Sequence, residues 1–307
     1  MAESSNDFDA LFKSKFGFSY TEDSDALQEL RVSPYDRWKL VSEILDLLPD
    51  APASLFIHVP KTGGTTLGES VARNNLRNVV SCDAEDKEFL SMLRACCVAP
   101  NEMGILFRAH HPYGTIFKNN DESRFDFIFS SFRDPLSVHI SNVTMILERL
   151  DKYYRGLDQG QGVQKFCEIW DRVIVEGELK FNNSSECAVA ILASPHYVKT
   201  MAGVYDKFFG RCSDEQLRNV TFFDYRQFDT FMVQRFGFET PPERRNVAQN
   251  RKLEIQDIPS MVSQTLLEKD EQIVDRIQAL ISGEMQQPDQ TSGFIQLVKS
   301  AFRRKRN

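Results

Sequence analysis

The feature that most constrains the fold is a series of short, continuous apolar runs that alternate with stretches of helical character. The runs are SLFIHV, NVVSC, GILFRAH, FDFIFSSF and VTFFDY, at residues 54–59, 78–82, 104–110, 125–132 and 220–225. Such runs are typical of strands buried on both faces, as in a parallel sheet whose strands are joined by helices. Residues 137–213 carry few strand signals. We therefore expect an α/β domain with a parallel sheet flanked by helices and a mainly helical insertion.

The segments outside these runs set the expected domain limits. Residues 1–32 are polar and weakly patterned, which predicts a flexible N-terminal arm. The α/β domain is expected over 33–290, starting with a helix that Ser33 caps and Pro34 begins. A second helix is expected over 259–281, packed through Val262, Leu266, Ile273 and Ile277. Residues 291–307 form an amphipathic, basic tail. That pattern suits contact with an anionic membrane surface, or packing on the domain with the charged end in water.

Composition excludes several classes of protein. The chain has 307 residues, enough to bury a full core, and a net charge of -7, from 37 Lys and Arg against 44 Asp and Glu. An acidic balance argues against nucleic acid as a partner. The six cysteines have no CxxC spacing, so we expect reduced thiols and no metal site. There is no apolar run long enough to span a bilayer and no signal-peptide pattern at the start, so we expect a cytoplasmic protein.

The stretch FIHVPKTGGTTL, from Phe56, predicts a phosphate-binding loop. A buried strand that turns through glycines into a helix presents free main-chain N–H groups at the positive end of the helix dipole. Gly63 and Gly64 allow the main chain to approach a phosphate, and Lys61 adds a positive charge. Hydroxyl donors come from Thr62, Thr65 and Thr66. An ordinary strand-to-helix turn is the alternative, since glycine and threonine are common there, but the coincidence of all these residues favours the phosphate loop.

Two further motifs follow apolar runs. FIFSSFRDPLSVHISN places Arg133 at the end of a strand, where its planar guanidinium suits a phosphate group, and Ser141 two helical turns further on. ILFRAHHPYG places His110 and His111 at the end of another strand, the edge at which open α/β sheets keep their active sites. Histidine suits general-base work because its ordinary pKa lies near neutrality. A buried structural hydrogen bond is the alternative role for either histidine.

The kind of phosphate loop is indicated by the order of its residues. The G-x-x-x-x-G-K-[ST] pattern of ATPases and kinases is absent, because Lys61 precedes the glycines. PKTGGTTL instead resembles the phosphosulfate-binding loop of sulfotransferases that use 3'-phosphoadenosine-5'-phosphosulfate (PAPS). The resemblance is closest to the branch with the heparan and chondroitin-type carbohydrate sulfotransferases. It spans roughly residues 55–251 and implies a P-loop-type sheet.

The resemblance also implies roles for the other motifs. Relatives have R-D-P-x-x-R-x-x-S where this chain has Arg133 and Ser141, and these residues would grip the 3'-phosphate of the donor. Val138 stands in place of the second arginine of that motif. His110 matches the histidine proposed as the base in several carbohydrate sulfotransferases, and His111 is the next candidate. Lys61 would stabilise the charge on the leaving oxygen.

Two less specific segments complete the resemblance. In PPERRNVAQNRK, Asn246 and Arg251 are the candidates for closing over the adenine and the 3'-phosphate, ahead of Arg244 and Arg245. SPHYVKTMAG resembles a segment on the acceptor side, where Lys199 and His196 would meet the substrate; a solvated helix end explains them equally well.

The resemblance implies a sulfotransferase that moves the sulfuryl group of PAPS to a hydroxyl of a carbohydrate, a glycan-like molecule or a small hydroxylated metabolite. PAPS is then the co-substrate, and no metal is expected. A P-loop ATP-dependent phosphotransferase and a non-catalytic nucleotide-binding protein are the alternatives. The sequence does not indicate the acceptor or the oligomeric state.

Overall fold

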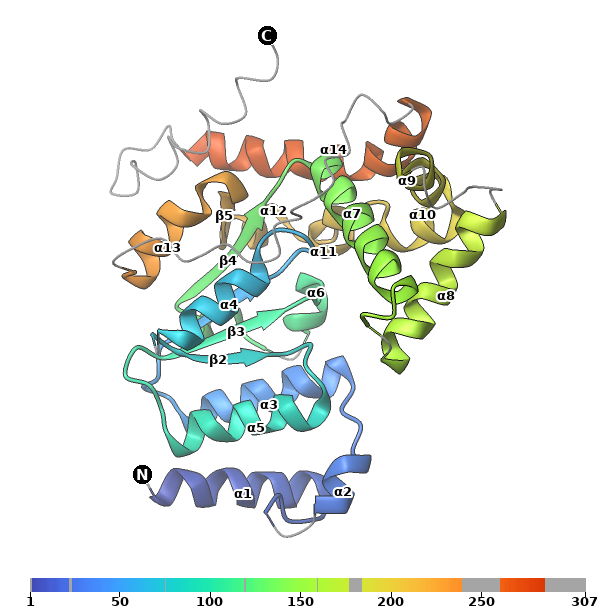
Figure 1. Ribbon diagram of the computed structural model, residues 1–307. Helices are drawn as coiled ribbons and strands as arrows, with labels where there is room; N and C mark the ends of the chain where they lie inside the picture. Colours follow the sequence, from blue (N-terminus) through green and yellow to red (C-terminus); the bar gives the residue numbers. More distant parts are fainter. Residues whose placement is uncertain are drawn as a thin grey trace. The chain divides into compact units, whose positions relative to one another are not determined.

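The computed structural model describes residues 2–21, 24–74, 76–118, 120–158, 160–176, 184–238 and 260–284. Contacts between residues divide the chain into two compact units. The first holds the described residues of Met1–Phe132 and Arg211–Arg245, and the second holds those of Arg133–Gly210 and Asn246–Glu284. Figure 1 traces the helices and strands along the chain.

The first unit is built on a five-stranded sheet in which every pair of neighbours is parallel, in the order β2-β3-β1-β4-β5. The strands are β1 (Ala53–Ile57), β2 (Asn78–Ser81), β3 (Ile105–Ala109), β4 (Phe127–Phe132) and β5 (Val220–Asp224). All five overlap the predicted apolar runs, and every residue of β1 is buried. The prediction of an α/β fold with a parallel sheet and flanking helices is therefore confirmed.

The helices of the first unit pack on the sheet or on one another. They are α1 (Ala2–Phe16), α2 (Ser24–Glu29), α3 (Pro34–Leu47), α4 (Gly64–Arg73), α5 (Asp86–Val98), α6 (Tyr113–Ile116), α12 (Asp214–Arg218) and α13 (Phe228–Phe236), with short 3-10 turns η1 (Glu122–Arg124) and η2 (Tyr225–Gln227). As predicted, the Ser33 hydroxyl caps α3 by accepting from the Asp36 N–H. Helices α4 and α13 pack on the strands through a cluster rich in phenylalanine that includes Phe56, Phe129 and Phe231.

The N-terminal segment differs from its prediction. Residues 1–32 were expected to be a flexible arm, but α1 buries Phe8 and Phe12 almost completely and packs on α3 and α5 (Figure 1). Asp9 of α1 also pairs with Arg94 of α5 at 3.2 Å. The aromatic residues recur every four positions, so they form one apolar stripe on a helix whose average composition is polar.

The second unit is helical, which confirms the predicted helical segment. Its helices are α7 (Pro135–Tyr154), α8 (Gln161–Glu176), α9 (Ser184–Ala193), α10 (Pro195–Met201), α11 (Val204–Phe209) and α14 (Ser260–Glu284). A buried apolar cluster joins α7, α8, α9 and α10 to Leu266 and Leu267 of α14. The predicted helix over 259–281 is thus confirmed, with Leu266, Ile273 and Ile277 buried.

No helix in the described ranges combines the length and the apolar character needed to cross a bilayer. The predicted tail at residues 291–307 lies outside the described residues, and so do the candidate ligand contacts Asn246 and Arg251, together with Arg244 and Arg245.

Candidate functional site

The predicted phosphate loop lies between β1 and α4 and has an unusual main-chain conformation. Gly63 precedes the first residue of α4 with φ 92°, and Lys61 has φ 68°. Among the described residues, Lys61 is the only non-glycine with a positive φ. Left-handed main chain is unfavourable for a lysine, and such outliers gather at functional sites. Gly63 is required twice over, because a Cβ there would also lie 2.7 Å from the Tyr225 ring.

The amino end of α4 has the properties of an anion site. The N-cap residue of this ten-residue helix, Gly63, has no side chain that could cap it. Turns with left-handed residues make main-chain N–H groups converge, and the helix dipole favours negative charge at this end. The Thr66 side chain is buried in the first turn of the helix.

The loop is braced from within. Thr62 is completely buried, and its hydroxyl donates to the Val59 carbonyl oxygen at 2.7 Å. The hydroxyl of Ser131 in β4 donates to the Thr62 carbonyl oxygen, also at 2.7 Å. In this conformation the Thr62 hydroxyl, predicted as a ligand donor, therefore stabilises the turn itself.

His58 joins the loop to the sheet. It continues β1 by one residue, and its N–H donates to the Ala109 carbonyl oxygen at 2.8 Å. Its buried ring stacks on Phe56, and its Nε2 accepts from the Gly64 N–H at 3.0 Å. A Cβ at position 64 would overlap this ring, which explains why glycine is needed there. Since Nε2 accepts, Nδ1 carries the hydrogen, and this buried Nδ1 has no hydrogen-bond partner among the described residues.

His110 is placed beside His58 by the register of the sheet. Ile57 pairs with Ala109, so the next residues on the two parallel strands are neighbours, and the two imidazole centroids are 4.0 Å apart. Nδ1 of His110 lies 2.7 Å from the His58 carbonyl oxygen. A carbonyl can only accept, so Nδ1 carries the hydrogen and Nε2 holds the lone pair. The residue keeps exposed surface, as a proton acceptor for a substrate requires.

Nearby charges adjust the His110 imidazole. Desolvation of the ring by the surrounding protein lowers its pKa below the ordinary value. The Asp83 carboxylate raises the pKa and also accepts the His110 main-chain N–H at 2.7 Å. Arg108 and Lys61 lower the pKa through their positive charges.

His111 has one ring nitrogen in a hydrogen bond within the protein and the other near a carboxylate. Its Nδ1 accepts from the Trp38 indole N–H at 2.8 Å, and its Nε2 lies 3.6 Å from an Asp83 carboxylate oxygen. The ring thus ties α3 to the end of β3. Between the two histidines that the sequence offered as bases, the geometry favours His110.

Arg108 contacts the first residue of α4 and was not among the site residues predicted from the sequence. From β3 its guanidinium donates to the Gly64 carbonyl oxygen at 3.2 Å and to the Ser81 hydroxyl at 2.8 Å. Arg108 therefore binds the carbonyl oxygen of Gly64, the first residue of α4, while His58 binds the N–H of the same residue. The available signal was a charged residue inside the otherwise apolar run GILFRAH.

Arg133 and Ser141 belong to the second unit. The Tyr205 hydroxyl accepts from the Arg133 main-chain N–H at 2.9 Å and donates to the Arg133 carbonyl oxygen at 2.8 Å, so it fixes the main chain of this arginine. Ser141 is partly buried in α7. Val138, in place of the family's second arginine, is completely buried.

Other candidates are less constrained. Lys199 and His196, the residues expected on the acceptor side, are exposed on α10 of the second unit. The side chain of Thr65 lies outside what the structure describes.

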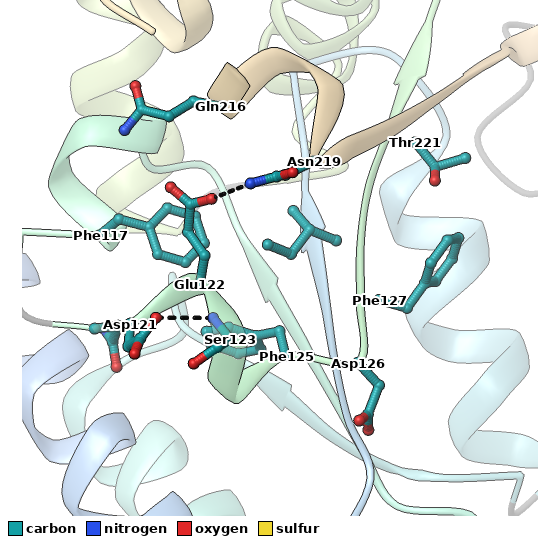
Figure 2. A pocket seen from close by; sticks show the side chains of 12 residues that line it. Phe117, Asp121, Glu122, Ser123, Phe125, Asp126, Phe127, Gln216, Asn219 and Thr221 are labelled. Atoms are coloured by element: carbon teal, nitrogen blue, oxygen red, sulfur yellow. Dashed lines mark hydrogen bonds between the residues drawn. The ribbon is translucent and has the colours of Figure 1, made fainter. Parts of the chain in front are cut away.

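Figure 2 shows a different hollow in the first unit, of about 720 Å³. It is lined by the acidic residues Asp121, Glu122 and Asp126 together with aromatic and amide side chains. It adjoins the amino ends of β4 and β5, whereas the loop follows the carboxyl end of β1. None of the predicted site residues lines it, so it is separate from the loop.

Comparisons of the chain with protein-family models, curated proteins and solved structures found no match.

Proposed function

We propose that the protein is a sulfotransferase that uses PAPS and sulfates a hydroxyl of a carbohydrate or of another small hydroxylated acceptor. The observation that carries this proposal is one juxtaposition in the first unit. The strained Lys61–Gly63 turn enters a helix whose N-cap is a glycine, and the neutral His58–His110 pair lies at the same end of the sheet.

The strand order supports a donor site beside β1. β1 connects to β2 across β3, whereas β4 connects to β5 in the opposite direction. Open α/β sheets bind ligands beyond the carboxyl ends of strands where the connections diverge in this way. The Lys61–Thr66 loop follows β1 and would hold the 5'-phosphosulfate through main-chain N–H groups. The proposal that Arg133 and Ser141 bind the 3'-phosphate rests on the sequence motif.

The chemical step is an in-line displacement at sulfur. His110 Nε2 takes the proton of the acceptor hydroxyl, whose oxygen forms a new bond to sulfur. The bond from sulfur to the bridging oxygen breaks, and its electron pair stays on that oxygen. The products are a sulfate ester, adenosine 3',5'-bisphosphate and a protonated His110, which returns its proton to solvent. Lys61 stabilises the negative charge that grows on the bridging oxygen.

Calorimetry tests this proposal against an ATP-dependent phosphotransferase. We expect adenosine 3',5'-bisphosphate to bind at least about tenfold more tightly than ADP with magnesium. Tighter binding of ADP would overturn the assignment. Arg133→Ala should remove most of the preference for adenosine 3',5'-bisphosphate over adenosine 5'-monophosphate, because the guanidinium is proposed to recognise only the 3'-phosphate.

Turnover separates an enzyme from a non-catalytic nucleotide-binding protein. The protein is incubated with PAPS and a panel of hydroxylated acceptors, with Lys61→Ala and His110→Ala as controls. Formation of adenosine 3',5'-bisphosphate that depends on an acceptor and is lost in both variants is expected. Tight nucleotide binding without turnover on any acceptor would favour the non-catalytic alternative.

A further inference from the structure

We propose that His58 is a positioning residue for the donor loop: its imidazole holds the Lys61–Gly64 turn in the anion-binding conformation by accepting the Gly64 N–H. This inference deepens the proposed function and rests on it for the identity of the ligand. It assigns a role to a residue that is not among the site residues predicted from the sequence.

His58 is 4% exposed, and its Nε2 lies 3.0 Å from the nitrogen of Gly64, the first residue of α4. The position of the ring is itself fixed, because it stacks on Phe56 and the main-chain N–H bonds to Ala109. The sheet therefore fixes the position of the ring, and the ring fixes the position at which the loop ends and α4 begins.

An imidazole is an unfavourable side chain for this buried place unless its ring makes a hydrogen bond. An apolar ring of similar size would fill the space without burying a polar group. His58 instead leaves a buried Nδ1–H with no partner among the described residues, which is unfavourable. The compensating interaction in the structure is the bond from Gly64 to Nε2. We infer that this acceptor is the reason for the histidine.

His58 contacts the loop and His110 through two different groups. The ring of His58 acts on the loop, whereas its main-chain carbonyl accepts from His110 Nδ1. Replacing the side chain removes the first interaction and keeps the second. A variant at position 58 should therefore weaken donor binding while the proton acceptor stays oriented.

The variants are chosen to isolate the acceptor atom. His58→Phe keeps a ring but cannot accept, and His58→Gln restores an acceptor at a similar reach. His139→Phe is the control, because it also removes a completely buried imidazole but from the second unit. We expect His58→Phe to raise the Kd for adenosine 3',5'-bisphosphate and the KM for PAPS about tenfold, the size expected for losing one buried hydrogen bond. We expect kcat to change less than about threefold, His58→Gln to recover most of the affinity, and His139→Phe to leave Kd unchanged.

Two measurements do not depend on the ligand. In wild-type protein, imidazole ¹⁵N spectra should show His58 with hydrogen on Nδ1 and none on Nε2. Amide exchange should show that the Gly64 N–H exchanges about tenfold faster in His58→Phe than in wild type. Hydrogen on Nε2, or equal exchange in the two proteins, overturns the positioning role.

Failure of the proposed function and failure of the positioning role of His58 give different experimental results. If wild-type protein does not bind adenosine 3',5'-bisphosphate, the proposed function fails, while the tautomer and the Gly64 exchange still decide whether His58 holds the loop. If the nucleotide binds to wild type and to His58→Phe with equal affinity, the proposed function stands and the positioning role fails. If His58→Phe does not fold, the wild-type tautomer and His58→Gln decide the question.

Discussion

The Nδ1 of His110 lies 2.7 Å from the main-chain carbonyl oxygen of His58. Because this bond takes the ring's hydrogen-bearing nitrogen, Nε2 is the atom that can receive a proton. The ring of the same His58 accepts the Gly64 N–H. The proposed base and the proposed donor loop are therefore both hydrogen-bonded to one residue at the end of β1.

His110→Gln is expected to lower kcat at least about 100-fold, because the variant keeps polar atoms but lacks a nitrogen that accepts a proton near neutral pH. His111→Gln is the contrasting variant, since one nitrogen of that ring accepts from Trp38 and the other lies near Asp83. It should lower the midpoint of thermal unfolding and reduce kcat far less. Steady-state rates and thermal melts check both, and a larger loss of kcat in His111→Gln would show that the base has been misassigned.

The acid limb of kcat/KM should have its midpoint below 6.5, the ordinary pKa of histidine. The base must be neutral to accept a proton, and desolvation by burial lowers the pKa of His110. As the pH falls, activity should therefore persist below 6.5 and be lost only when the pH passes through that lowered pKa. Asp83→Asn removes a charge that raises this pKa, and should move the midpoint lower still. A midpoint above 6.5, or a shift to higher pH in Asp83→Asn, is incompatible with His110 as the base.

Two substitutions at Lys61 separate its charge from its main-chain conformation. Lys61→Gly relieves a left-handed residue and should stabilise the protein by about 1 kcal/mol, whereas Lys61→Ala keeps the strain. Both remove the charge, so both should lower kcat by about 100-fold or more. Chemical denaturation and turnover are measured together. Retention of activity in Lys61→Gly would mean that the charge has no role in the chemistry.

Gly64→Ala should abolish nucleotide binding and destabilise the protein by about 1 to 3 kcal/mol, because the new methyl group overlaps the buried His58 ring. Gly114→Ala is the matched control: a Cβ there meets nothing within 4 Å. It should change stability by less than about 1 kcal/mol and leave binding intact. Normal binding by Gly64→Ala would show that the ring can move away and does not fix the loop.

Much of the first unit could be predicted because its signals are local. Four of the five strands are almost wholly buried and β2 is partly buried, so each appears as a continuous apolar run. The Ser33–Pro34 start of α3 and the glycine turn after β1 also depend on residues that are adjacent in the chain. The two histidines could be placed at the end of a strand for the same reason.

The details of the site depend on contacts that a single sequence does not contain. Trp38 reaches His111 across 73 positions, and this bond separates the roles of His110 and His111. The use of the Gly64 N–H by His58 depends on a ring orientation that the stacking on Phe56 determines. The helix over residues 2–16 was missed because average polarity concealed one aromatic stripe.

A crystal structure of the protein with adenosine 3',5'-bisphosphate is the measurement that decides most. We predict the 5'-phosphate at the amino end of α4, within hydrogen-bonding distance of main-chain N–H groups of the Lys61–Thr66 loop, with His110 Nε2 facing the open side of that phosphate. Nucleotide bound elsewhere, for example in the acidic hollow of Figure 2, with the loop empty, would contradict the proposed donor site.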